Sequence, residues 1–208
     1  MRILKEPEER KAEILDAAER LFITKGYSKT TIIDILNQIG IAKGTFYYHF
    51  KSKEEVMDAI ITRIVNRDAA AAKTIANNTN LSSPAKLLQI LFSLKPKSGE
   101  IKEQLTEQLH HPNNAEMHQK SLVLTIKKLT PVLTQVIEQG ISEKVMAVDY
   151  PYETVEMLLA CAIVIFDGEL FQHDAEVMAR KAIAFINMTE AALKTEKGVL
   201  SDMMKLFM

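Results

Sequence analysis

Residues 30–55 read TTIIDILNQIGIAKGTFYYHFKSKEE, and this stretch decides the fold of the 208-residue chain. Its first part places apolar residues at helical spacing, and Thr30 or Thr31 can cap the start of that helix. Gly40 interrupts the pattern, and a second short helix is predicted over roughly 43–49. Two helices of about eight residues joined by a short Gly-containing turn are typical of a helix-turn-helix.

The second helix of such a motif lies in the major groove of DNA, and this one carries suitable groups. Hydroxyl groups can donate hydrogen bonds to phosphate, lysines supply positive charge, and glycine lets the backbone approach closely. Tyrosine and histidine add ring contacts with a polar tip. We therefore expect DNA to be contacted by Thr30, Thr31, Lys43, Gly44, Thr45, Tyr47, Tyr48, His49, Lys51 and Lys53.

Two aromatic residues of this segment have packing as an alternative role. Phe50 is expected in the core, and Tyr47 could either pack or contact phosphate. The charge pattern supports the DNA interpretation: residues 20–53 contain six basic residues and one acid, net +5, although the whole chain carries −1. Phosphate contact needs only a local basic patch. A solvated basic face is the alternative.

The rest of the chain also predicts helices, because it is rich in helix-forming residues and almost lacks strand-like alternation. Gly140 is expected to end one long helix. The longest apolar run, residues 157–166, is about half of a membrane span. The start MRILKEPEERK is charged, unlike a signal peptide, and Cys161 is the only cysteine. We expect an all-α cytoplasmic protein without membrane contact.

The motif resembles the DNA-binding domain of the TetR/AcrR family of bacterial regulators. The family pattern is approximately T-x-x-x-I-A-x-x-A-G-V-S-x-G-T-x-Y-x-H-F-x-x-K-x-x-L. It is matched by Thr31, Ile35, Gly40, Ile41, Gly44, Thr45, Tyr47, His49, Phe50 and Lys53, and upstream by residues 14–27, ILDAAERLFITKGY. One departure is Ala42, which stands where the family commonly has serine, so a capping hydroxyl is missing before the second helix.

The resemblance implies that the C-terminal helices hold a small-molecule pocket. Several apolar residues lie where such a pocket would form, with simple core packing as their alternative role. Methionine-rich surfaces are adaptable, and the chain has ten Met, so an apolar effector fits best. The candidate ligand-binding residues are Leu88, Phe92, Leu105, Leu109, Met117, Leu122 and Ile126.

The resemblance also implies a homodimer, and the sequence supports one separately. Residues 155–166 contain a single charge, and a helix that is apolar on nearly all sides must be buried on nearly all sides. Two such helices from each chain would form a four-helix interface, with a deeply buried monomer core as the alternative. The candidate interface residues are Val155, Leu159, Ala162, Ile163, Phe166, Ala182, Ile183 and Ile186.

Catalytic and metal sites are not expected. The sequence has no GxSxG, HExxH or Gly-rich phosphate loop, so we predict neither an enzyme nor a bound cofactor. Four histidines raise the question of a metal, but no second cysteine or ordered carboxylate cluster supports one. These histidines are His110, His111, His118 and His173.

The sequence therefore predicts an all-α protein with two domains. Residues 1–52 would form a three-helix, helix-turn-helix DNA-binding domain, and residues 53–208 a larger helical domain for ligand binding and dimerisation. The expected function is a dimeric transcriptional regulator, a repressor released from a palindromic double-stranded operator by a small, largely apolar effector. The alternative is a helix-turn-helix activator or architectural DNA-binding protein without a ligand.

Overall fold

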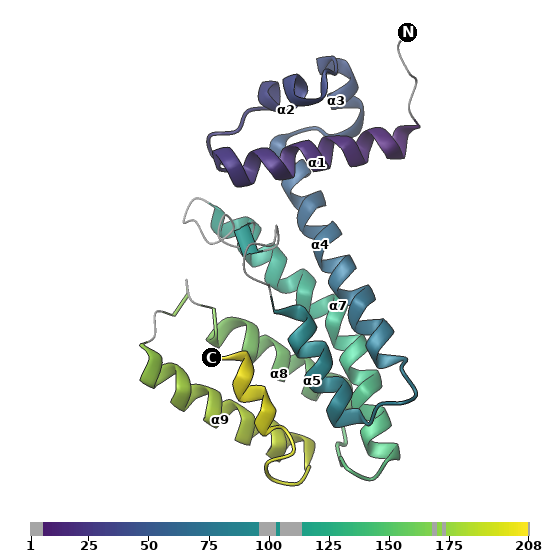
Figure 1. The fold of residues 1–208 in the computed structure, drawn as a ribbon, viewed down its shortest axis with the longest axis vertical. Helices are drawn as coiled ribbons and strands as arrows, with labels where there is room; N and C mark the ends of the chain where they lie inside the picture. Colours follow the sequence, from purple (N-terminus) through teal and green to yellow (C-terminus); the bar gives the residue numbers. More distant parts are fainter. Residues whose placement is uncertain (1–5, 96–102, 105–113, 168–169, 172–173, 208) are drawn as a thin grey trace. The chain divides into compact units, whose positions relative to one another are not determined.

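The computed structural model describes residues 6–95, 103–104, 114–167, 170–171 and 174–207, and within these ranges it contains helices and no strand. This confirms the all-α prediction. No helix in the described ranges has the length and apolar character that crossing a membrane requires. The elements are α1 (Pro7–Lys25), α2 (Ile32–Ile39), α3 (Lys43–His49), α4 (Lys53–Ala76), α5 (Ser83–Leu94), α7 (Ala115–Ser142), α8 (Pro151–Ile165), α9 (Ala175–Leu193) and the 3-10 helix η2 (Ser201–Leu206) (Figure 1).

The chain divides into two compact units. The first unit comprises residues 1–64 and 96–121, and the second comprises residues 65–95 and 122–208. Helix α4 begins in the first unit and ends in the second, so one continuous helix contributes to both. A functional division at residue 52 stays a prediction.

The first unit is built around α1, whose ends match its sequence. Pro7 begins the helix, and Gly26 ends it at a φ of 87°. On α4, Arg63 donates hydrogen bonds to Asp16, at 2.6 Å, and to Glu19, so the guanidinium ties α4 to α1. The fully buried side chains of this unit include Ile14, Phe22, Ile35, Phe46, Phe50, Val56, Met57 and Ile60.

In the second unit a buried lysine joins three helices. Lys86, on α5, is only 3% exposed, and its ammonium group donates to the carbonyl of Ala76, at the end of α4, and to Gln139, on α7, each at 2.6 Å. Glu143 accepts from the backbone N–H and the hydroxyl of Ser83 at the start of α5. The lysine charge therefore lies at the C-terminus of α4, where the helix dipole favours a cation.

The expected end of the long helix at Gly140 is wrong. Helix α7 continues through Gly140 to Ser142. A Cβ at position 140 would lie 2.5 Å from Sδ of Met146 and 2.9 Å from Oγ of Ser83, both of which are buried. The glycine is therefore required by close packing inside the second unit.

The C-terminal residues fold back onto α9. Asp174 caps the start of α9 by accepting from the N–H of Val177 at 2.8 Å. After α9 ends, the buried carboxylate of Glu190 accepts from the N–H groups of Gly198 and Leu200, both at 2.9 Å. These two bonds hold the turn that leads into η2.

Candidate nucleic-acid interface and apolar cavity

Helix α3 has an inward and an outward face. Phe46 and Phe50 are buried, with ring centroids 6.1 Å apart, and they fix the rotation of the helix about its axis. Tyr47 is 45% exposed and Tyr48 76% exposed, and the Lys43 ammonium lies 5.7 Å from the centroid of the Tyr47 ring. The outward face therefore combines a cation with two phenol rings.

The turn between α2 and α3 depends on one glycine. Gly40 adopts the left-handed conformation at a φ of 68°, which residues with a side chain rarely adopt. The N–H of Ile41 then donates to the carbonyl of Leu36 at 3.2 Å, and the carbonyl of Ala42 accepts the first hydrogen bonds of α3. After this turn, the first residues of α3, including Gly44, are exposed to solvent.

Asp34, the one acidic residue within the basic segment 20–53, has a structural role. Asp34 and Thr31 form a reciprocal capping box: the Asp34 carboxylate accepts from the Thr31 N–H at 2.8 Å, and the Thr31 hydroxyl accepts from the Asp34 N–H at 3.2 Å. The Lys25 ammonium donates to the same carboxylate at 2.6 Å. These hydrogen bonds, that from Lys25 foremost, lower the pKa of Asp34 to about 2.

We expect the Asp34 contacts to stabilise the first unit in a pH-dependent way. The pKa of Asp34 is lowered from 3.8 to about 2 by folding, so its contribution is present above pH 3.8 and is lost as the pH falls towards 2. Urea unfolding of the wild type and Asp34→Asn over this range measures the effect. The two unfolding midpoints should differ above pH 3.8 and converge in more acidic solution, and a constant difference would refute the assignment.

Two residues predicted to contact DNA instead form hydrogen bonds to backbone carbonyls within the first unit. Thr30 is only 1% exposed, and its hydroxyl donates to the carbonyls of Leu21 and Gly26 at the end of α1. The Lys53 ammonium donates to the carbonyls of Tyr27 and Thr30 at 2.8 and 2.9 Å. Both side chains hold the connection between α1 and α2, so we remove them from the proposed interface.

The other DNA-binding candidates lie on or near the surface of α2 and α3. Thr31 and Lys51 are exposed, and Thr45 and His49 are half-buried. Ile33, on α2 close to Thr31, is also exposed, at 66%.

Serine in place of Ala42 is expected to stabilise α3. Ala42 is the exposed N-cap residue of this helix and has extended backbone angles, φ −75° and ψ 151°, but no side-chain acceptor. A serine hydroxyl could accept from the free N–H groups of the first turn, which contributes about 0.5–2 kcal/mol. Thermal unfolding of Ala42→Ser measures the increase in stability, and a melting temperature equal to that of the wild type would contradict the prediction.

The residues predicted for a dimer interface lie mostly inside the second unit. Val155, Leu159, Ala182 and Ile186 are buried within the chain, and their role at a dimer interface stays a prediction. Ala162, Ile163 and Phe166 are half-buried against the same core. Ile183 is the member of the set that is exposed, at 51%.

The residues predicted for a ligand pocket do not gather at one described site. Leu105 and Leu109 lie outside the described residues. Met117 belongs to the first unit, whereas Leu88, Phe92, Leu122 and Ile126 belong to the second. Phe92 is 36% exposed and the others are half-buried. Their role in binding stays a prediction.

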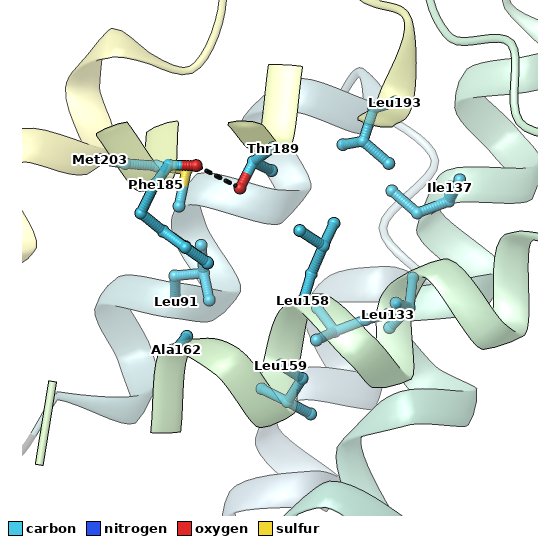
Figure 2. Close-up of a pocket in the computed structure, with 11 residues that line it drawn as sticks. Leu91, Leu133, Ile137, Leu158, Leu159, Ala162, Phe185, Thr189, Leu193 and Met203 are labelled. Atoms are coloured by element: carbon cyan, nitrogen blue, oxygen red, sulfur yellow. Dashed lines mark hydrogen bonds between the residues drawn. The ribbon is translucent and has the colours of Figure 1, made fainter. Parts of the chain in front are cut away.

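A cavity of about 80 Å³ lies instead between α5, α7, α8, α9 and η2 (Figure 2). All of its walls belong to the second unit. Three residues predicted for the dimer interface, Val155, Leu159 and Ala162, line it. The other lining residues are Leu91, Leu133, Ile137, Leu158, Phe185, Thr189, Leu193 and Met203.

The histidines give no described metal site. His110, His111 and His173 lie outside the described residues, and His118 is buried. Within the described part of the chain, no three His, Cys, Asp or Glu side chains come together in a group that could hold a metal ion.

Known proteins resemble both parts of the chain. A family described as "Bacterial regulatory proteins, tetR family" matches residues 14–60, and one described as "Tetracyclin repressor-like, C-terminal domain" matches residues 97–188. The transcriptional regulator TtgR of Pseudomonas putida is 38% identical over 60 residues, which is 29% of each chain. This match spans less than a third of the curated relative.

Solved structures share the fold over most of the chain. The complex of SmeT with triclosan has a TM-score of 0.59 at 21% identity and covers 92% of this chain and 94% of its own. The complex of RolR with resorcinol has a TM-score of 0.60 at 13% identity and covers 97% and 94%. Together the two family matches cover more than half of the 208 residues. The chain belongs to the TetR family of bacterial regulatory proteins, whose members are transcriptional regulators and not enzymes.

Proposed function

We propose that this protein is a dimeric repressor that binds a palindromic operator in the cytoplasm and is released by a small, largely apolar effector. The observation that carries the DNA-binding part is the outward face of α3. Lys43, Gly44, Tyr47 and Tyr48 are exposed together, and buried Phe46 holds the helix in that orientation. This face lies in the segment of net charge +5, which suits phosphate contact.

A dimer would give the protein two such faces. Recognition helices about 34–36 Å apart meet successive major grooves on one side of the duplex. A two-fold symmetric protein then reads a palindromic site, because each half-site meets the same residues.

The exposed sides of α8 and α9 offer the surface for that dimer. Met157 is 67% exposed on α8, and Ile183 and Met188 are 51% and 45% exposed on α9. Ala184 and Ala191 are also exposed on α9, and small residues let another helix approach closely. Exposed apolar side chains on two neighbouring helices are typical of an interaction surface.

The effector part rests on the C-terminal family match and on the apolar cavity. SmeT and RolR, which share the fold, bind triclosan and resorcinol. An effector can release DNA only if it binds better to the conformation that does not fit the operator. Helix α4 is the proposed link, because it contributes to both units and Arg63 ties it to α1.

Selection from random duplexes, followed by fluorescence anisotropy, tests DNA binding. The wild-type protein should enrich a palindromic sequence. Lys43→Ala should weaken binding to it and lower the salt dependence of the affinity by about one phosphate contact. Lys73→Ala, an exposed lysine on α4 in the second unit, is the matched control. No enrichment, or equal losses in both variants, would contradict the proposal.

Release from the enriched duplex tests the effector. A panel of uncharged small molecules should contain compounds that lower the affinity for DNA. If none does, the chain is better described by the alternative, an activator or architectural protein without a ligand.

A further inference from the structure

A lysine outside the helix-turn-helix lies beside the end of α3. Lys11 is in the second turn of α1, and its ammonium nitrogen lies 5.9 Å from the centroid of the Phe50 ring. Phe50 directly follows α3, and its N–H donates to the carbonyl of Phe46 in that helix at 2.9 Å. The contact therefore brings the positive charge of Lys11 to the C-terminal end of α3.

The ammonium group of Lys11 is available for a further partner. Two other basic residues of α1 are paired with acids, because Arg10 donates to Glu13 and Lys25 donates to Asp34, both at 2.6 Å. Across the described residues, no carboxylate lies within ion-pair distance of Lys11. A lysine ammonium has three donors, and its contact with a ring leaves donors that can bind an anion.

Both ends of α3 therefore have an ammonium group nearby. Lys43 is the first residue of the helix and lies 5.7 Å from the centroid of the Tyr47 ring, whereas Lys11 lies at the other end. At 1.5 Å per residue, the seven residues of α3 span about 10 Å. The major groove of B-DNA is about 12 Å wide. The two cations are thus separated by about the distance between the two backbones that border the groove.

We propose that Lys11 binds a DNA phosphate on the strand opposite to the one that Lys43 contacts. The inference rests on the proposed function, because it extends the surface of α3 that is proposed to bind DNA. A contact between lysine and phosphate positions the protein and carries no sequence information. Lys11 should therefore strengthen binding to every duplex by a similar factor, whereas the outward side chains of α3 would select among sequences.

Packing against Phe50 is the alternative role of Lys11. The methylene stem of a lysine can cover an aromatic ring, and a cation is favourable near a ring or at the C-terminus of a helix. Two substitutions separate the roles. Lys11→Met keeps an unbranched side chain against the ring and removes the charge, whereas Lys11→Arg keeps the charge.

The salt dependence of DNA affinity measures the phosphate contact. The full-length protein is titrated by fluorescence anisotropy with a random-sequence duplex and with the enriched palindrome, between about 50 and 200 mM salt. For each half-site bound, the slope of log affinity against log salt should be shallower by about 0.9 in Lys11→Met. The fourfold rise in salt should then weaken the wild type about threefold more than the variant for each half-site.

Two control variants keep the wild-type slope if the inference is correct. Lys11→Arg retains the charge beside α3, and Lys73→Met makes the neutral substitution at an exposed lysine of α4 in the second unit. A wild-type slope in a folded Lys11→Met would overturn the inference and leave packing against Phe50 as the role of this residue.

Neutral methylphosphonate linkages locate the contact. Each phosphate of one half-site is replaced in turn, and the affinities of the wild type and the variants are compared. The phosphate that binds Lys11 is the one whose replacement weakens the wild type but not Lys11→Met. Lys43→Ala should be insensitive to a different phosphate, on the other strand. The same phosphate for both lysines would contradict the proposed arrangement.

The two duplexes distinguish failure of this inference from failure of the proposed function. A wild type that binds the random duplex but enriches no palindrome would remove the proposed repressor, while the slopes on the random duplex still test Lys11. A wild type that enriches a palindrome, with equal slopes in Lys11→Met, would leave the proposed function standing and refute the Lys11 contact. A wild type that binds no duplex would remove both.

Discussion

Replacing Phe46 by alanine is expected to lower the free energy of unfolding of the first unit by about 3–5 kcal/mol. Phe46 has no exposed surface and packs between Tyr47 and Phe50, whose ring centroids lie 5.5 and 6.1 Å away. Removing the ring leaves a cavity beneath α3, and the loss of packing frees the rotation of the helix. DNA binding should disappear with it.

Chemical denaturation followed by circular dichroism measures this effect. Tyr48→Ala is the control, because Tyr48 is 76% exposed on the same helix, and its removal should change stability by no more than about 0.5 kcal/mol. Tyr48→Ala should nevertheless weaken DNA binding. Equal stabilities of the two variants would show that α3 is not anchored through Phe46.

A glutamate at position 183 is expected to dissociate the proposed dimer. Ile183 is 51% exposed on α9, whereas Ala182 and Ile186 on the same helix are buried. A two-fold interface would place two carboxylates in an apolar surface without partners, which costs several kcal/mol. We expect the dimer dissociation constant to rise by about 100-fold or more.

Sedimentation velocity at micromolar concentration measures the oligomeric state. Ile33→Glu adds the same charge to an exposed isoleucine of the first unit and should remain dimeric. A monomeric wild type, or an Ile183→Glu variant that stays dimeric, would contradict the assignment of this face.

The helix-turn-helix could be predicted from sequence because its signals are local. Thr31 caps α2, Gly40 permits the turn, and α3 covers residues 43–49 as expected. Two polar residues of this segment have structural partners that the sequence did not reveal. Thr30 donates to a carbonyl at the end of α1, and Lys53 donates to a carbonyl in the connection between α1 and α2; sequence patterns do not show which polar side chains have such partners.

Which side of α8 is buried and which is exposed could not be predicted from the sequence in the same way. A helix that is apolar around most of its circumference has no periodicity that separates an inner from an outer side. Val155 and Leu159 point into the unit, whereas Met157 is 67% exposed. Gly140 shows a similar limit: a glycine near a helix end predicts termination, but its actual role is to make room for Met146 and Ser83.

A hydroxyl-radical footprint on the selected duplex shows whether two copies of α3 contact the DNA together. We expect two protected half-sites on one side of the duplex, with centres one helical turn apart, or about 34–36 Å. Both should fade together in Tyr48→Ala. A single protected half-site, or protection that persists in Tyr48→Ala, would contradict it.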